Sequence, residues 1–232
     1  MIMKPRHVAV ILDGNRRFAK RLMLEPWKGH EYGEKKVEKL IDWCLKLGIE
    51  ELTIYTFSIQ NFNRPKKEFD YLMNLIKDAF NNFCDDLKIK KYGIKVNVLG
   101  RYSMFPKDVV AAIDKIIAKT KNNKKFILNF AMAYGGREEL TDAVRRIAQE
   151  VKRGRLDPEK INEKVVEANL YTTSEPDIII RTGGEKRTSN FLMWQSSYSE
   201  WFFLEKTWPE FTQQDLIDVL KEFEQRERRF GK

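Results

Sequence analysis

Apolar and polar residues along the chain form two alternating patterns: short, nearly continuous apolar runs, and longer stretches in which apolar residues recur every three or four positions. The first run covers residues 8–12. It is too short to cross a membrane and too continuous for a strand with one exposed face, so it predicts a central strand of a parallel sheet. Similar runs predict further strands at 52–57, 94–99, 126–131, 178–180 and 201–204.

The longer stretches have the spacing of amphipathic helices. One contains Val37, Leu40, Ile41 and Cys44, and Gly48 is expected to end it. A second helix should follow Pro65 and carry a broad apolar stripe made of Phe69, Leu72, Leu75, Ile76, Ala79, Phe80, Phe83 and Leu87. Further helices are expected at 108–119, 137–152, 158–167 and 213–228.

The alternation of strands and helices predicts an α/β fold with a mostly parallel sheet of about six strands flanked by helices. The chain has 232 residues, enough for one sizeable core, and no composition shift marks a linker. We therefore expect one domain, residues 1–232. No signal peptide or membrane span is recognisable, and Cys44 and Cys84 fall within apolar helical patterns. These features predict a cytoplasmic protein with reduced thiols in its core.

The first predicted strand is followed by Asp13, Gly14, Asn15, Arg16 and Arg17. Ligands of parallel α/β sheets collect at this edge, where a glycine lets the backbone approach closely and guanidinium groups match phosphate oxygens. A carboxylate among phosphate ligands would repel them unless a cation such as Mg²⁺ bridges the two. The segment therefore indicates a site for Mg²⁺ and phosphate. The alternative is a helix cap beside two solvated arginines.

Other polar clusters follow later strands. Residues 58–65 follow the second strand, and residues 181–189 follow the fifth. Arg181, Arg187 and Ser189 surround paired glycines and could form a second phosphate pocket. Neither a Walker P-loop nor a dinucleotide-binding motif occurs. Two phosphate sites beside a wide apolar helix face predict substrates with an anionic head and an apolar tail. The stripe would form one wall of a tunnel, or it would simply pack on the sheet.

The chain carries 43 Lys and Arg against 34 Asp and Glu, a net charge of +9, which favours an anionic partner. A phosphorylated small molecule, a nucleic acid and an anionic membrane surface all meet this requirement. No nucleic-acid-binding motif is recognisable, and the arginines cluster at strand ends instead of along one exposed face. We therefore expect no nucleic-acid partner.

Six segments, in this order along the chain, resemble those of one enzyme family: HVAVILDGNRRFA, GHEYG, TFSIQNFNRP, NFAMAYGGR, RTGGEKRTSNFLMWQSSYSEWFF and RRFGK. The chain thus resembles the cis-prenyltransferase family, which includes undecaprenyl and dehydrodolichyl diphosphate synthases. The resemblance covers nearly the whole chain. It implies a parallel α/β sheet with a hydrophobic tunnel between sheet and helices, and a dimer, here expected to be a homodimer. It also implies the Mg²⁺-dependent condensation of isopentenyl diphosphate onto an allylic prenyl diphosphate, repeated to build a long-chain polyprenyl diphosphate.

The resemblance further implies roles for individual residues. Asp13 would hold Mg²⁺ on the allylic diphosphate, and Asp13 and Asn61 would be the catalytic residues. The residues expected to bind the two substrates are Gly14, Asn15, Arg16, Arg17, His30, Ser58, Phe62, Arg64, Arg181, Arg187 and Ser189. Glu200 resembles a glutamate that reaches the metal site across the dimer. The terminal Arg229 and Gly231 resemble a tail that contacts the isopentenyl site of the partner subunit.

Several positions depart from the pattern of bacterial members. Arg16 replaces a glycine, and Phe18 and Phe62 replace tryptophans, which places the chain nearer the archaeal and eukaryotic branch. Pro26 stands where many members have an arginine, and Lys186 stands where they have a histidine near the metal.

Several points stay open at the level of sequence. The product length, the primer and the acceptor are not readable, and the proton of the isopentenyl unit could pass to Asp13, to Asn61 through a water, or to a diphosphate oxygen. A single transfer of a preformed prenyl group and a non-catalytic partner subunit are the alternatives to chain elongation. Retention of Asp13, Arg17, Arg181 and Arg187 favours an enzyme. The apolar product also suggests peripheral contact with a membrane.

Overall fold

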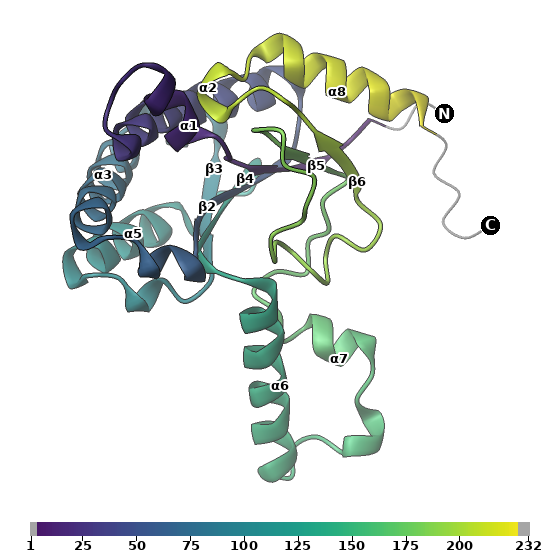
Figure 1. Ribbon diagram of the computed structural model, residues 1–232. Helices are drawn as coiled ribbons and strands as arrows, with labels where there is room; N and C mark the ends of the chain where they lie inside the picture. Colours follow the sequence, from purple (N-terminus) through teal and green to yellow (C-terminus); the bar gives the residue numbers. More distant parts are fainter. Residues whose placement is uncertain (1–3, 227–232) are drawn as a thin grey trace.

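The computed structural model describes residues 4–226, which contain one sheet of six parallel strands (Figure 1). The strands are β1 (His7–Ile11), β2 (Glu51–Ser58), β3 (Ile94–Leu99), β4 (Phe126–Tyr134), β5 (Ile178–Arg181) and β6 (Glu200–Phe203). Their order across the sheet is β3-β4-β2-β1-β5-β6, and every neighbouring pair runs parallel. The predicted α/β class and the six predicted strands are confirmed.

β1 lies in the middle of the sheet, between β2 and β5. Its residues are all buried, as expected for a continuous apolar run covered on both faces. At its carboxyl end Ile11 pairs with Tyr55 on one side and with Arg181 on the other. Because parallel strands end at the same edge, the polar segments after β1, β2 and β5 meet there.

The helices are α1 (Asn15–Arg21), α2 (Gly29–Leu47), α3 (Lys66–Cys84), α4 (Leu87–Tyr92), α5 (Lys107–Thr120), α6 (Gly136–Lys152), α7 (Glu163–Glu167) and α8 (Gln213–Gln225). Short 3-10 turns lie at Pro26–Lys28, Ile59–Asn63, Tyr102–Met104, Pro158–Lys160 and Trp208–Glu210. Buried side chains of α2, α3, α5 and α8 form the larger hydrophobic core with strand residues such as Val8 and Val10. These four helices therefore pack on one face of the sheet.

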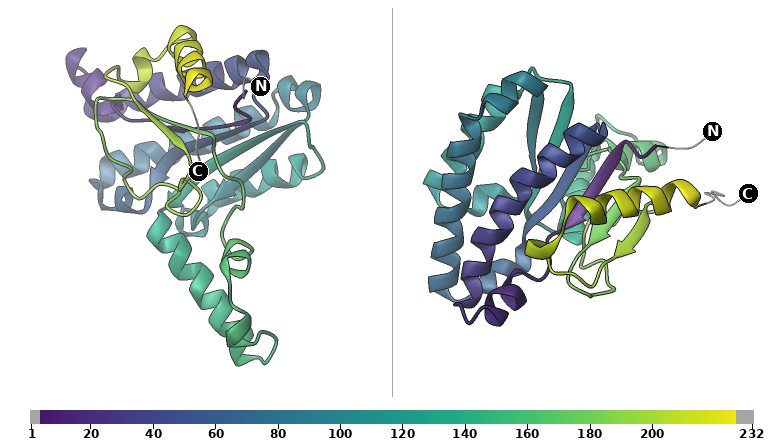
Figure 2. Two further views of the ribbon diagram at one scale, coloured as in Figure 1. Left: turned by 90° about the vertical axis from the view of Figure 1, so that its right-hand side faces the viewer. Right: turned by 90° about the horizontal axis from the view of Figure 1, so that it is seen from above.

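The other face of the sheet carries a smaller core. Ala9, Ile11 and Tyr55 pack there against Tyr134 and Phe191, and the rings of Tyr55 and Phe191 stack with their centroids 4.7 Å apart. Phe191 belongs to the long segment between β5 and β6, so this segment covers part of the face. α6 and α7 extend away from the sheet as an arm (Figures 1 and 2).

Three predicted helices differ from the observed ones. The predicted helix 213–228 ends at Gln225, because Arg226 has an extended backbone. The helix after Pro65 ends at Cys84 instead of continuing through Leu87, which begins α4 and is 85 % exposed. The Asp86 side chain accepts a hydrogen bond from the backbone N–H of Lys88 and so caps a new helix. The predicted helix 158–167 is a 3-10 turn followed by α7, because the Asn162 side chain accepts a hydrogen bond from Val165 and starts a separate helix.

Both cysteines are free and buried, as predicted. Burial raises the pKa of the Cys44 thiol to about 12, so it stays protonated. Among the helices in residues 4–226, none combines the length and the apolar composition that a membrane crossing requires.

Candidate active site

Asp13 lies just beyond the carboxyl end of β1, between two arginines. Its Oδ2 atom accepts a hydrogen bond from Arg181 Nη2 at 2.8 Å, and its Oδ1 atom accepts one from Arg17 Nη2 at 3.2 Å. The side chain of Arg181 is 4 % exposed, whereas that of Asp13 is 28 % exposed. The carboxylate therefore offsets two guanidinium charges at the edge of the sheet and remains accessible.

Arg181 also connects this carboxylate to the segment after β5. Its Nη1 atom donates to Ser189 Oγ at 2.6 Å and to the carbonyl oxygen of Arg187. Within residues 4–226 its buried Nε atom has no hydrogen-bond partner, and the same holds for Asn15 Oδ1. Buried polar atoms are seldom left unpaired, so two such atoms beside one cavity are consistent with a ligand or ordered water there.

Two glycines allow the backbone to approach these side chains closely. Gly14 has φ +104°, and a Cβ atom there would lie 2.6 Å from Thr207 Cβ. Gly183 has φ +88°, and a Cβ atom there would lie 2.5 Å from Arg17 Nη2. A larger residue at Gly14 would combine backbone strain with a clash against Thr207, and one at Gly183 would strain the backbone and displace the Arg17 guanidinium.

A second group of charged residues faces the same edge from α1, α2, the segment before α3, and the first turn of α3. Arg64 Nη1 contacts His30 Nε2 at 3.1 Å and donates to Glu68 Oε1 at 2.8 Å. Glu68 is almost fully buried and also faces Arg16 at 3.9 Å. One buried carboxylate therefore binds Arg64 and attracts Arg16 beside His30.

His30 is neutral at physiological pH. Burial, together with the positive charges of Arg64 and Arg16, lowers the pKa of His30 to about 3. The imidazole therefore adds no positive charge to the site, and it can accept or donate one hydrogen bond at each nitrogen according to its tautomer.

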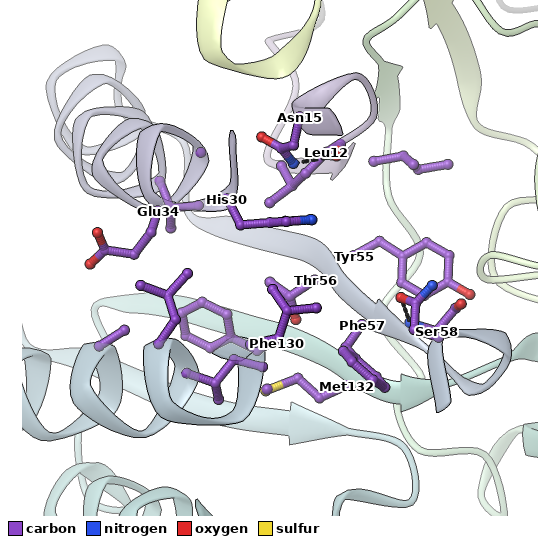
Figure 3. A pocket seen from close by; sticks show the side chains of 18 of the residues that line it. Leu12, Asn15, His30, Glu34, Tyr55, Thr56, Phe57, Ser58, Phe130 and Met132 are labelled. Atoms are coloured by element: carbon purple, nitrogen blue, oxygen red, sulfur yellow. Dashed lines mark hydrogen bonds between the residues drawn. The ribbon is translucent and has the colours of Figure 1, made fainter. Parts of the chain in front are cut away.

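Two cavities join at these residues. The larger, about 630 Å³, runs between the sheet and helices α2 and α3, and the smaller, about 310 Å³, is lined by Gly14, Arg16, Arg17 and Arg187. Both are lined by Leu12, Asp13, Asn15, His30 and Arg64. Figure 3 shows Asn15 and His30 on one side of the larger cavity, with Phe130 and Met132 on the opposite side. A charged cradle thus opens directly onto an apolar cavity.

The described residues contain no group of three or more His, Cys, Asp or Glu side chains that could hold a metal ion by themselves. Asp13 is the carboxylate that lines both cavities. A divalent cation at this edge would therefore need oxygens from a second source, and phosphate oxygens of a ligand could supply them.

The sequence profile of a family described as putative undecaprenyl diphosphate synthase matches residues 11–231. The chain belongs to this family. The predicted resemblance and the predicted enzyme class, a prenyl diphosphate synthase, are thereby confirmed. The arrangement of a phosphate cradle beside an apolar cavity is consistent with such an enzyme.

Relatives of this synthase come from archaea and bacteria. It is 46 % identical over 230 residues to the tritrans,polycis-undecaprenyl-diphosphate synthase (geranylgeranyl-diphosphate specific) of Thermococcus kodakarensis, covering 98 % of this chain and 87 % of that protein. It is 43 % identical over 234 residues to an isoprenyl transferase of Thermus thermophilus, covering 98 % and 89 %.

Two solved structures have the same fold as the synthase. Lavandulyl diphosphate synthase from Lavandula x intermedia, in complex with dimethylallyl diphosphate, matches with a TM-score of 0.95 and 37 % identity, covering 99 % of each chain. A probable undecaprenyl diphosphate synthase from Campylobacter jejuni matches with a TM-score of 0.82 and 31 % identity, covering 99 % of this chain and 100 % of the other.

Most of the predicted site residues come together in the synthase. The residues that line one or both cavities are Asp13, Gly14, Asn15, Arg16, Arg17, His30, Ser58, Asn61, Arg64, Arg181, Arg187 and Ser189. Phe62 does not line either cavity. Its ring packs against Phe57, Phe69 and Phe105, with centroids 5.2 to 5.7 Å away. Phe62 therefore supports the segment that carries Asn61.

Glu200 is far from Asp13 within one chain. It is the first residue of β6 and so lies at the amino-terminal ends of the strands, whereas Asp13 lies at their carboxyl ends. Its carboxylate accepts a hydrogen bond from Arg226 at 2.7 Å. Arg229 and Gly231 lie outside the described residues. The proposed contacts of these three residues with a neighbouring subunit therefore stay predictions.

The sequence analysis missed Glu68. Its role becomes visible only when the fold places Arg16, from α1, beside the first turn of α3. One signal was present in the sequence, because Arg64 and Glu68 are four residues apart, a spacing at which opposite charges can pair.

Proposed function

We propose that this synthase condenses isopentenyl diphosphate onto an allylic prenyl diphosphate and repeats the step to make a long-chain cis-polyprenyl diphosphate. The junction of the two cavities carries the proposal. Guanidinium groups and exposed glycine backbone line the smaller cavity, and apolar side chains line most of the larger one. A diphosphate suits the first environment and a prenyl tail suits the second.

The allylic diphosphate would bind in the smaller cavity. Gly14 leaves room for phosphate oxygens against the backbone, and Arg16 and Arg17 line the same space. Guanidinium forks pair well with phosphate oxygens. Neutral His30 and Arg64 stand where the head and the tail of the substrate would meet.

Isopentenyl diphosphate would bind beside it, at the segment after β5. Arg181 is held in place by Ser189, and Arg187 lines the smaller cavity. With both substrates bound at adjacent sites, the reacting carbons can be held in a productive orientation. Asn61 lines the larger cavity and accepts a hydrogen bond from the Ser58 N–H at 2.9 Å, so its amide is fixed near the reacting groups.

Mg²⁺ would be held by Asp13 together with diphosphate oxygens. The donor set fits, because Mg²⁺ is commonly bound by one or two carboxylates plus substrate phosphates. When bound, the ion stabilises the negative charge that develops on the departing diphosphate. Arg17 and Arg181, already fixed beside Asp13, stabilise the same charge, and the apolar wall around Phe130 keeps water away from the cation-like carbon.

The names of the archaeal relatives support geranylgeranyl diphosphate as the primer. Archaeal relatives from Thermococcus, Pyrococcus, Methanopyrus and Methanocaldococcus are 45 to 47 % identical to this chain, and their names specify that primer. Successive additions of isopentenyl units would then extend the chain within the larger cavity.

A homodimer and a cytoplasmic location belong to the proposal. Within one chain Glu200 cannot reach Asp13, so a contribution to the metal site would come from Glu200 of the partner subunit. β6 is an edge strand, and the half-buried rings of Trp201 and Phe203 stack on it with centroids 5.7 Å apart. An edge strand of this kind is suited to being covered by a second copy.

The test measures incorporation of labelled isopentenyl diphosphate with geranylgeranyl diphosphate, in Mg²⁺ and in EDTA, followed by sizing of the dephosphorylated product. We expect a long polyprenol in Mg²⁺ and only background in EDTA. Asp13→Ala should lower kcat about 100-fold or more, because the variant lacks the carboxylate that would hold Mg²⁺ beside the departing diphosphate. Asp70→Ala, at an exposed carboxylate on α3, should keep the native rate.

The outcomes separate the alternatives. No incorporation with any allylic primer would contradict the proposal, and addition of one unit or transfer to another acceptor would favour single prenyl transfer. An unchanged rate for Asp13→Ala would remove Asp13 from the catalytic residues.

A further inference from the structure

α4 and the turn between α5 and β4 lie together at the amino-terminal edge of the sheet, opposite the active site. The backbone N–H of Lys125 donates to the carbonyl oxygen of Gly93 at 3.1 Å, and Asn123 Nδ2 donates to that of Ile94 at 2.7 Å. These bonds join the end of α4 to the turn at residues 121–125. The side chains of both segments therefore form one surface.

This surface is strongly basic. We define the basic corner as Lys88, Lys90, Lys91, Lys119, Lys121, Lys124 and Lys125. Lys88 pairs with Asp42, and Lys119 faces Asp85. The other five lysines are exposed and form no ion pair within residues 4–226. Their charge is therefore available to an anionic partner.

The basic corner also carries exposed apolar groups. Leu87 is 85 % exposed and Tyr92 is 36 % exposed, whereas Ile89 between them is buried and anchors α4. Leu87 follows Asp86, whose carboxylate caps α4, and precedes Lys88, with Lys90 and Lys91 further along the same helix. An exposed leucine beside several lysines has the composition of a surface that enters the boundary between lipid head groups and acyl chains.

The basic corner lies beside the far end of the larger cavity. Along α3 the cavity wall runs from Leu72 to Phe83, about 16 Å at the rise of an α-helix. On α2 it reaches Ile41. The next residue, Asp42, forms the ion pair with Lys88 of α4 at 2.8 Å. α4 therefore lies immediately beyond the end of the larger cavity that is farthest from the smaller cavity.

We infer that the basic corner docks the synthase onto an anionic phospholipid bilayer, with Leu87 inserted among the head groups. The inference rests on the proposed function, since docking here would place the end of the product cavity next to the lipid phase that receives a polyprenyl chain. Lysines attract anionic lipid from within a Debye length of the membrane, and each contributes about a fivefold factor in binding.

The test measures binding of the full chain to vesicles by flotation, without substrates. Vesicles of phosphatidylcholine alone are compared with vesicles that also contain phosphatidylglycerol, at low and high salt. We expect binding only to the anionic vesicles, weakened by salt. The double variant Lys90→Glu/Lys91→Glu should bind at least tenfold more weakly, and Leu87→Ser should weaken the binding that persists at high salt.

A matched control changes the same number of charges elsewhere. Lys107→Glu/Lys221→Glu alters exposed lysines on α5 and α8 and should keep native vesicle binding. All variants should keep native isopentenyl incorporation in detergent, which shows that they are folded. Because flotation needs no substrate, failure of docking and failure of the proposed function are separate results.

Equal loss in the control, binding to neutral vesicles as tight as to anionic ones, or native binding by the α4 variants would overturn the inference. So would tight binding of an RNA oligonucleotide through the same lysines in the absence of vesicle binding.

Discussion

Arg64 takes part in the contacts that hold the charged cradle together. It contacts His30 at 3.1 Å and Glu68 at 2.8 Å, and Glu68 also faces Arg16. Since Glu68 is almost fully buried, its charge is tolerated only because the two arginines offset it. Glu68, which does not line either cavity, thus fixes Arg64 by a hydrogen bond and lies within ion-pair distance of Arg16.

Glu68→Ala should destabilise the protein by roughly 3 kcal/mol, because removing one partner of a buried ion pair leaves the other charge uncompensated. Without Glu68, Arg64 is no longer fixed in position. The variant should therefore have a higher KM for the allylic diphosphate. Urea unfolding and steady-state kinetics measure the two effects. Asp70→Ala, which breaks the exposed pair with Lys66, should cost about 0.5 kcal/mol or less. An equal loss of unfolding free energy in Glu68→Ala and Asp70→Ala would show that the buried pair contributes no more to stability than the exposed one.

At the scale of elements, α3 supplies one wall of the larger cavity. Leu72, Leu75, Ile76, Ala79, Phe80 and Phe83 line it, as the predicted apolar stripe requires. The prediction succeeded over this length because helical spacing alone puts these residues on one face. It failed at Leu87, where the capping carboxylate of Asp86 starts a new helix.

Ala79 is the smallest side chain of this wall. Ala79→Leu should narrow the cavity and shorten the polyprenyl product by at least one isoprene unit, with little change in the rate of the first addition. Product sizing after dephosphorylation gives the readout. Ala118→Leu, at an exposed position of α5, serves as the control and should leave the product length unchanged. Products of native length from Ala79→Leu would show that the tail takes another path.

The strands and the clusters after them were predictable because their signals are local. Continuous apolar runs such as residues 8–12 predicted the sheet, and the positions of Asp13 and Arg181 after strands predicted that charged side chains gather at one edge of it. The rest depended on tertiary packing. The sequence did not show that Asp13 pairs with both arginines, that Phe62 packs among other phenylalanines, or that Glu68 faces Arg16.

At the scale of the whole molecule, both histidines link stability to pH. Burial lowers the pKa of His7, which lies within a polar network with Thr53 and Ser174. The pKa of His30 is about 3. In the unfolded chain each histidine titrates near 6.5, so below that pH the unfolded state binds more protons than the folded state. The contribution of the two neutral histidines to the free energy of unfolding is therefore complete above pH 6.5 and decreases as the pH falls towards 3.

The prediction is that the free energy of unfolding decreases from pH 7.5 to pH 5. In His30→Gln, the decrease should be smaller, because one of the two groups that take up protons on unfolding is gone. Urea titrations of both proteins at the two pH values provide the comparison. An identical decrease in both would mean that His30 has an ordinary pKa in the folded protein.

The ion pairs of Asp13 have a consequence for how selective the enzyme is. Arg17 and Arg181 already have the Asp13 carboxylate as a counter-ion. The binding free energy of an incoming anion is therefore only the difference between its interaction with the arginines and the interaction that the carboxylate already makes. Monovalent or singly phosphorylated competitors gain little from this exchange. A ligand with several negative oxygens, able to share a cation with the displaced carboxylate, gains much more, and the site thereby discriminates against the abundant small anions of the cell.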